Sequence, residues 1–458
     1  MPYRLCLVSA LALISTPALA QDKDEPFTLQ EAIGNPDNFK ISGSARVRYE
    51  ALHNQFRPGL DRNDDLVTMR FTLAAEYDGD PIKVGAEVQD SRAYFADLGS
   101  SVNNGDVNAL ELIQAYVGVD LGKPLGHGSE GQLTAGRFTL DLGSRRLVGR
   151  NNFRNATNAF TGVRVDAKGA KGGKVTAFLT MPQQRLPSDK PSILDNKVQW
   201  DHEGTDLVFY GVFSSFPKLV GGADLETYFY GLDEDDRDGV ATRNRRLYTP
   251  GARLLKAPAN GKIDYDLEYA HQFGSIAAST APDAARQDVS ANFAHAAVGY
   301  RLDAKWQPRI ALEYDYASGN HPGGDYNRFD SLYGPRRSDF GPTGIYGPLG
   351  RSNIHAPGVR FEVKPSDRLD AFVGYKALWL DSVTDSFANT GVRDQAGTAG
   401  RFAGQQVEGR MRYWFVKDFL RLDTGAAVLF DGRFLRDAAN ANRTGDTLYG
   451  YIDLTATF

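Results

Sequence analysis

The sequence predicts an all-β domain, a transmembrane antiparallel β-barrel of about 18 strands with short turns at one end and long loops at the other. Three observations predict this fold class: an export signal at the start, stretches in which apolar and polar residues alternate, and connections that alternate in length. Alternation with a period of two indicates strands with one apolar and one polar face. Strands that cross lipid must close into a barrel, because every backbone polar group there needs a partner.

The start of the chain predicts a Sec-type signal peptide that is cleaved after Ala20. Arg4 precedes an apolar run over 5–19, and the segment ends on small residues, as a cleavage site requires. The run is too short for a membrane-spanning helix. The single cysteine, Cys6, lies inside this segment, so we expect neither a disulfide nor a thiolate site in the mature chain.

The expected location is the bacterial outer membrane, because no later segment approaches ~20 continuous apolar residues. The predicted organisation is 1–20 for the signal peptide, 21–38 for a short periplasmic lead with a helical turn at 29–33, and 39–458 for the barrel.

Eighteen segments have strand character. They cover 39–52, 62–77, 82–95, 108–121, 131–138, 159–168, 172–181, 204–213, 223–233, 246–256, 261–272, 287–301, 306–317, 354–364, 368–380, 404–416, 419–431 and 444–458. In the last segment Leu448, Ile452 and Leu454 lie on one face. Tyr449 and Asp453 lie on the other. A terminal strand leaves an open edge that invites aggregation, so we expect it to pair with the first strand and close the barrel.

The connections fall into two sets. Short turns cover 78–81, 169–171, 257–260, 302–305, 365–367 and 417–418, with longer ones at 122–131 and 214–222. Long polar loops cover 96–107, 139–158, 182–203, 234–245, 273–286, 318–353, 381–403 and 432–443. Sorted loops are typical of outer-membrane barrels, whereas a β-sandwich or propeller has no reason to sort them. For the loop 318–353, the Gly-Pro steps fit both a segment folded into the barrel and a flexible external loop.

The sequence offers no catalytic or metal-ligating set, and we predict no cofactor and no enzyme activity. The seven histidines are scattered, without a serine or carboxylate at a catalytic spacing. The acidic run 233–239 resembles half of a calcium loop, but Arg245 occupies the position that needs a bidentate glutamate. The net charge is −5, or −6 once Arg4 is removed with the signal peptide. This charge gives no indication of nucleic-acid binding, which depends on positive charge.

Arginine concentrates on the predicted lumen face. If the apolar residues of each strand contact lipid, the intervening residues point inward. The inward arginines, all near mid-strand, are Arg46, Arg48, Arg70, Arg164, Arg360, Arg410 and Arg412. Guanidinium groups bind carboxylates bidentately and keep their charge. A ring of them would attract an anionic solute, while weak binding at several sites lets it leave.

Acidic residues also point inward on the predicted strands. They are Asp264, Asp266, Glu268, Glu313, Asp315, Glu408 and Asp423. Two interpretations therefore stay open: the arginines guide anions, or they pair with lumen acids as a structural ladder. The inward basic residues gather on the first, second, sixth, fourteenth and sixteenth strands, and the inward acidic residues gather on the eleventh to thirteenth. This separation also predicts a transverse electric field across the pore, as in a general-diffusion porin.

Several motifs, in order along the chain, resemble the alginate-export family of outer-membrane porins. They are Asp90-Ser91-Arg92, Gly136-Arg137-Phe138, 142–149, 152–155, 160–164, and 329–353 followed by 357–360. The resemblance covers essentially the whole mature chain. It implies an eighteen-stranded monomeric barrel with an arginine-rich constriction that moves an anionic uronate polysaccharide outward. The resemblance also adds Arg92, Arg137, Arg145 and Arg146 to the pore-lining residues. Strict alternation, however, turns Arg92 and Arg137 outward. Their place in the pore therefore requires a bulge in the strand or a position above the lipid band.

We therefore predict an outer-membrane channel for the export or passage of acidic, alginate-like polysaccharide or related anionic solutes. The alternative is a general-diffusion or small-anion uptake porin with a transverse field. The expected partners are an anionic polysaccharide or oligosaccharide, outer-membrane lipid and lipopolysaccharide. Periplasmic export partners stay open, and no nucleic acid is expected.

Overall fold

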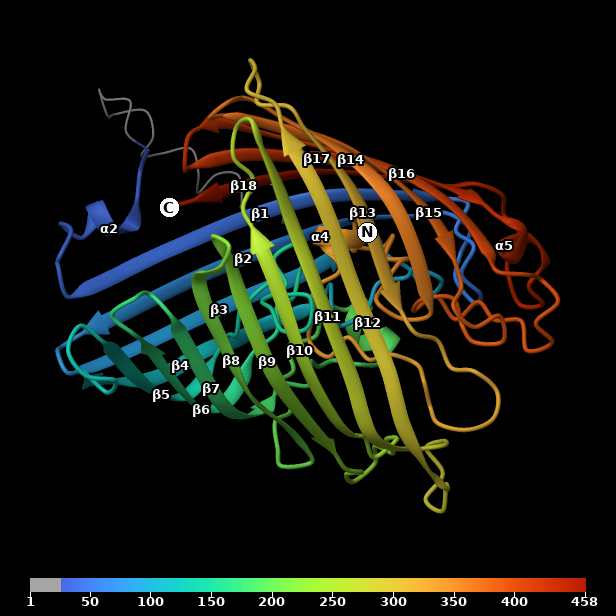
Figure 1. Ribbon diagram of the computed structural model, residues 1–458, viewed down its shortest axis with the longest axis horizontal. Helices are drawn as coiled ribbons and strands as arrows, with labels where there is room; N and C mark the ends of the chain where they lie inside the picture. Colours follow the sequence, from blue (N-terminus) through green and yellow to red (C-terminus); the bar gives the residue numbers. More distant parts are fainter. Residues whose placement is uncertain (1–25) are drawn as a thin grey trace.

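Strand β1 (Phe39–His53) pairs on one side with β2 (Asp64–Asp78) and on the other with β18 (Thr447–Thr457), so the antiparallel sheet of eighteen strands closes into a barrel (Figure 1). The computed structural model describes residues 26–458, and the predicted signal peptide lies outside the described residues. The strands between are β3 (Ile82–Tyr94), β4 (Asn108–Gly122), β5 (Glu130–Phe138), β6 (Phe160–Lys168), β7 (Lys174–Pro182), β8 (Leu207–Val220), β9 (Ala223–Glu234), β10 (Arg246–Lys256), β11 (Lys262–Ala277), β12 (Arg286–Arg301), β13 (Arg309–Ala317), β14 (Ile354–Ser366), β15 (Leu369–Trp379), β16 (Phe402–Val416) and β17 (Leu420–Asp431).

All eighteen predicted strands are confirmed, but the lengths of two connections were predicted wrongly. Strand β8 continues to Val220, so the predicted turn 214–222 is the pair Gly221-Gly222, which joins β8 directly to β9. Both glycines have positive φ, as a two-residue hairpin turn of the type favoured by strand twist requires. Strand β11 likewise continues to Ala277, which shortens the next loop to 278–285.

The two faces of the barrel wall differ in polarity as the alternation predicted. On β1 the outward side chains of Val47 and Tyr49 are 40% and 46% exposed. The intervening Arg46, Arg48 and Glu50 are buried within the barrel. An apolar exterior around a polar interior is typical of a barrel that contacts lipid.

The seam between the first and last strands is held by hydrogen bonds and by buried ion pairs of Arg46 and Arg48 on β1 with Asp453 on β18. The backbone N–H of Gly43 donates to the Phe458 carbonyl (2.7 Å), and the N–H of Phe458 donates to the Gly43 carbonyl (2.9 Å). A Cβ on Gly43 would lie 2.5 Å from the Phe458 ring, so a larger residue here would have to displace that ring. Inside the barrel, Nε and Nη2 of Arg48 donate to Oδ2 of Asp453 (3.0 and 2.7 Å).

We expect Asp453→Ala to destabilise the barrel by about 3–5 kcal/mol, because it removes the carboxylate that the buried Arg48 and Arg46 share and leaves Arg48 only Glu50 at 3.7 Å. The measurement is equilibrium unfolding by urea from lipid vesicles. The matched control is Asp367→Ala, which breaks an exposed pair with Lys364 and should change stability by less than about 0.5 kcal/mol. Equal effects of the two substitutions would show that the seam does not depend on the ion pair.

Between residues 26 and 458, four short helices lie outside the strands. They are α2 (Leu29–Ala32), α3 (Lys190–Leu194), α4 (Arg337–Phe340) and α5 (Arg433–Asp437). The helical turn predicted at 29–33 is confirmed as α2, whose first turn is capped because the Thr28 hydroxyl accepts from the Glu31 N–H (3.1 Å). Helix α4 belongs to the connection 318–353 and lies within the ring of strands (Figure 1). Among residues 26–458, helices of the length and apolar character needed to cross a bilayer do not occur.

Candidate functional site

Two long connections fold into the barrel and narrow its lumen. In the first, 139–159, the buried side chain of Asn155 fixes the loop to the inner surface. Its amide nitrogen donates to the backbone carbonyls of Met69 (2.9 Å) and Arg92 (3.1 Å), on β2 and β3. It also donates to the carbonyl of Asp106 (2.9 Å), in the neighbouring loop. One side chain therefore ties this loop to two strands and a second loop.

Three of the predicted lumen arginines hold the backbone of the same loop. Nη1 of Arg46 donates to the carbonyl of residue 152 (2.8 Å), and Nη1 of Arg48 donates to that of residue 153 (2.6 Å). Nη1 of Arg70 donates to the carbonyl of residue 154 (3.2 Å). Carbonyl groups are neutral, so these bonds leave the positive charge of Arg70 uncompensated.

The second inward connection is 318–353, and the structure decides between the two alternatives that the sequence left open. The Tyr346 hydroxyl donates to Oε1 of Gln406 on β16 (2.8 Å). The backbone N–H of Ile345 donates to Oε2 of Glu50 on β1 (3.0 Å). All four residues are buried, so the loop is an ordered segment inside the barrel.

Guanidinium groups and aromatic rings form a continuous row that links the two inward loops to the wall. Arg48 lies 3.9 Å from the centroid of the Phe153 ring, and Arg360 lies 3.7 Å from that of Phe372. Arg337 of α4 joins the two rings, at 5.0 Å from Phe153 and 5.9 Å from Phe372. These distances are typical of cation–π contacts, and they order arginines from β1, α4 and β14 along one side of the lumen.

Several lumen arginines have carboxylate partners, as the structural-ladder interpretation requires. The pairs are Arg164 with Asp166 (2.6 Å), Arg360 with Glu362 (2.6 Å), and Arg410 and Arg412 with one shared Asp370 (3.3 and 3.1 Å). Two guanidinium groups on a single carboxylate leave one positive charge over. Both interpretations therefore apply, each to a different subset of the arginines.

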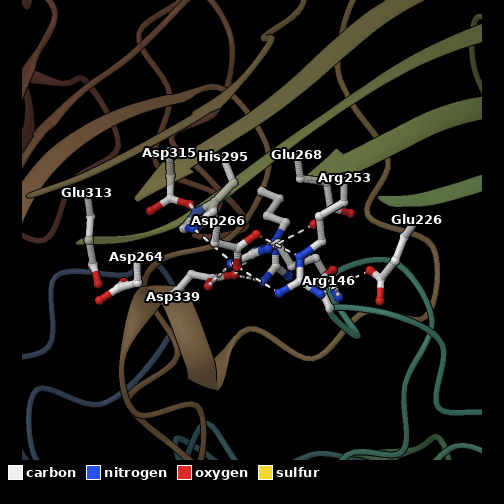
Figure 2. Close-up of polar contacts among 12 residues, drawn as sticks. Arg146, Glu226, Arg253, Asp264, Asp266, Glu268, His295, Glu313, Asp315 and Asp339 are labelled. Carbon is white, nitrogen blue, oxygen red and sulfur yellow. Dashed lines mark hydrogen bonds and ion pairs between the residues drawn. The ribbon is translucent and has the colours of Figure 1, made fainter. Parts of the chain in front are cut away.

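The predicted acidic side of the lumen is present on β11 and β13, with Glu226 of β9 beside it, but basic side chains compensate it (Figure 2). Arg146 reaches from loop 139–159 to Asp266 (3.0 Å) and Glu268 (2.8 Å). The other pairs are Arg253 with Glu226 and Asp266, Arg309 with Asp264, and Lys376 with Glu313 and Asp315. The transverse field is therefore weaker than the sequence predicted. Arg253, Arg309 and Lys376 lie on β10, β13 and β15, where alternation also turns them inward, and only Arg146 comes from a loop.

Asp339 of α4 joins the two inward loops. Its carboxylate accepts from Nε of Arg146 (3.1 Å) and from Arg351, whose side chain is fully buried. Burial alone would raise the pKa of Asp339, but Arg146 and Arg351 hold it well below its usual range. Ligand atoms of Asp339, His295 and Asp315 lie within 4.8 Å of one another, but the cationic partners of the two carboxylates already supply the charge that a metal ion would bring.

Two residues that the resemblance assigns to the pore, Arg92 and Arg137, do not lie in the lumen. The alternation of β3 continues without interruption, so Arg92 points outward near the extracellular end of the strand and pairs there with Asp90 (2.9 Å). Arg137 also lies on the outward face, where Glu111 (2.9 Å) and Glu203 (3.1 Å) bind it. Strict alternation, which turns Arg92 and Arg137 outward, is therefore correct for both residues. At these positions an ion pair replaces contact with lipid.

The other two residues from the resemblance, Arg145 and Arg146, lie in inward loop 139–159 but differ in environment. Arg146 is buried among carboxylates of the acidic side. Arg145 has φ of 62°, and its side chain is half-exposed, with the Asp141 carboxylate 4.0 Å away.

Sequence reasoning missed a group of arginines in the loops. Arg57 and Arg336 donate to backbone carbonyls of loop 318–353, and Arg154 lies near both. Burial, together with repulsion from Arg154, lowers the pKa of Arg57 to about 10 and that of Arg336 to about 9, so both stay charged at neutral pH. The adjacent pair Arg336-Arg337 in a Gly-Pro-rich loop was the available signal, and it needed the assumption that the loop folds inward.

Comparison with known proteins relates this barrel to a protein family and to solved structures. A family model described as alginate export matches residues 37–447. The crystal structure of OccK8 (OprE) from Pseudomonas aeruginosa is similar at 12% identity, with a TM-score of 0.58, 92% of this chain covered and 98% of that chain. OccAB1 from Acinetobacter baumannii is similar at 13% identity, with a TM-score of 0.57 and coverage of 91% and 96%. OccD3 (OpdP) from Pseudomonas aeruginosa is similar at 13% identity, with a TM-score of 0.56 and coverage of 92% and 91%.

At these identities the solved structures show the fold alone, and no curated protein sequence matches the chain significantly. The fold is that of an outer-membrane porin, and fold and family together support a channel in the bacterial outer membrane. The family model spans nearly all of the eighteen-stranded barrel, and the chain therefore belongs to the alginate export family.

Proposed function

We propose that the barrel is a passive channel for acidic polysaccharide of alginate-like chemistry, or for related anionic solutes. The observation that carries this proposal is a set of lumen and loop guanidinium groups for which the described part of the chain offers no carboxylate ion pair. They are Arg57, Arg70, Arg154 and Arg336. A solute that brings carboxylates supplies the missing partner.

The chemistry of these groups suits a polyanion in transit. Guanidinium groups take carboxylates in bidentate, charge-assisted hydrogen bonds, and the carbonyls that now accept from Arg70 and Arg336 are neutral. Several such groups in succession let a chain exchange one contact for the next, so no single site traps it. The excess cation on Arg410 and Arg412 extends the same property to β16.

A general-diffusion or small-anion uptake porin is the alternative, and the acidic side of the lumen favours it. Its carboxylates are engaged by Arg146, Arg253, Arg309 and Lys376, which reduces their effect on a passing anion. Arg57, Arg70, Arg154 and Arg336, by contrast, have no carboxylate ion pair within the described chain, so we favour the anion channel.

Outward passage is the direction that the family description favours, driven by the gradient of the solute or by periplasmic export partners. The apolar outer face would contact outer-membrane lipid and lipopolysaccharide. Family and fold suggest a channel rather than an enzyme.

Swelling of liposomes that contain the purified protein tests the proposal. Trigalacturonate and maltotriose have the same number of sugar rings and differ in charge. We expect swelling to be faster with trigalacturonate at low ionic strength, and the difference to shrink in high salt as the arginine charges are screened. Equal swelling rates at low salt would favour the general-diffusion alternative.

A further inference from the structure

A polar cavity, separate from the arginine row, lies at the end of the barrel that carries the long loops. Its volume is about 540 Å³, within the range of small-ligand sites. The loops β9–β10, β11–β12 and β13–β14 supply its rim. Its floor is apolar and buried, and consists of Leu247, Ile276, Val289 and Phe329.

One cation that lines this cavity, Arg243, has N–H donors that are not used in hydrogen bonds within the described chain. Its Nε donates to the Ala277 carbonyl (2.8 Å), and its guanidinium lies 4.6 Å from the centroid of the Tyr326 ring. These two contacts fix the orientation of the group. Among residues 26–458, neither a carboxylate nor any other acceptor is hydrogen-bonded to its terminal nitrogens Nη1 and Nη2.

The other charged groups around the cavity are already paired. Arg245 binds Glu234 (2.6 Å) and Asp330 (2.6 Å), and Arg328 binds Asp385 (2.7 Å). Arg243 is therefore the one cation of the lining for which the described residues provide no counter-charge. One positive charge directed into a cavity without a counter-ion favours a ligand with a single carboxylate at this point.

The remaining lining groups suit a ligand rich in hydroxyls. The side chains of Thr280, Tyr326, Ser331 and Asn389 line the cavity, and within the described chain they make no hydrogen bonds of their own. They offer both donors and acceptors. A sugar ring presents hydroxyls around its edge and C–H groups on its faces, which matches a polar rim above an apolar floor.

We propose that this cavity is an extracellular binding site for one acidic sugar residue, with the carboxylate on Arg243 and the ring hydroxyls on the polar rim. The inference rests on the proposed function for its ligand class, and it adds a discrete site at the extracellular mouth of the barrel, apart from the arginine row. Such a site would hold the end of an acidic polysaccharide as it leaves or enters the barrel.

Calorimetric titration of the purified, detergent-solubilised protein with trigalacturonate tests the site. Arg243→Gln removes the charge and keeps a side chain of similar length. Arg393→Gln is the matched control, because Arg393 also donates through Nε to a loop carbonyl (Thr384, 2.7 Å) but does not line the cavity. We expect Arg243→Gln to weaken binding about tenfold, the loss of one charge-assisted contact, and Arg393→Gln to bind as the wild type does.

Three outcomes are decisive. Unchanged trigalacturonate affinity in Arg243→Gln, or equally tight binding of maltotriose by the wild type, overturns the proposal. Loss of affinity in Arg243→Gln, with ion selectivity retained in planar bilayers, supports it and separates the site from the lumen. If the wild-type channel shows no anion preference while binding still depends on Arg243, the lumen proposal fails and the extracellular site stands.

Discussion

Replacing Asp339 by asparagine is expected to release loop 318–353 from the lumen. The substitution leaves the fully buried Arg351 without its carboxylate and removes one of three acids from Arg146. Removing one partner of a buried ion pair costs about 3–5 kcal/mol. The ion pairs of Asp339 act together with buried apolar side chains of the loop, such as Phe340 and Leu349, and losing the ion pairs shifts the balance toward an open state.

Two measurements report the release. Trypsin should cut after Arg336 or Arg337 in Asp339→Asn but not in the wild type, where both side chains lie inside the barrel. Single-channel currents should become larger and should fluctuate. The control is Asp437→Asn, which breaks an exposed pair with Arg433 on α5. A protease pattern and conductance equal to those of the wild type would show that Asp339 does not hold the loop.

The same contact predicts how the loop responds to acid. Because the pKa of Asp339 is depressed in the folded protein, its contribution to stability is fully present above the pKa of a free aspartate, about 3.9. It is lost only as the pH falls through the lower, folded value. Wild-type currents should therefore stay steady from neutral pH down to about pH 4.

The second large effect is expected from Arg70→Ala combined with Arg410→Ala. Arg70 donates to neutral carbonyls, and Arg410 shares Asp370 with Arg412, so each substitution removes a charge that is incompletely compensated. A unit charge about 4 Å from an ion contributes about 1 kcal/mol in water-like surroundings. We expect the anion-to-cation permeability ratio in 0.1 M KCl to fall at least about fivefold.

Arg92→Ala serves as the control for this variant. Arg92 is also an arginine of the barrel wall, but it points outward, so its removal should leave the permeability ratio unchanged. A ratio that falls equally in Arg92→Ala, or that stays constant in the double variant, would mean that the lumen arginines do not set the selectivity. In 1 M KCl the differences should largely disappear, because the screening length falls to about 3 Å.

The strands and their two faces could be predicted from the sequence because both depend on local alternation. All seven arginines that alternation assigned to the lumen do point inward, and it was the residue-by-residue transfer from the family that misplaced Arg92 and Arg137.

The inward loops could not be predicted in the same way, because long-range contacts fix them. Arg146 and Asp339 are 193 residues apart, and Ile345 lies 295 residues from its partner Glu50. No local pattern encodes such pairs. The same limit applies to the acidic side of the lumen, whose compensation by Arg146 depends on where loop 139–159 folds.

The most direct test of the central claim, that arginines along the lumen conduct acidic sugars, is a reversal potential with different anions on the two sides. A bilayer containing the wild-type protein would separate potassium chloride from potassium galacturonate at equal, low concentration. We predict a measurable galacturonate permeability and a reversal potential that moves toward zero in Arg70→Ala/Arg410→Ala, because potassium, at equal concentration on both sides, then carries a larger share of the current. A wild-type channel that carries potassium while excluding galacturonate, with the same reversal potential in the double variant, would contradict the account.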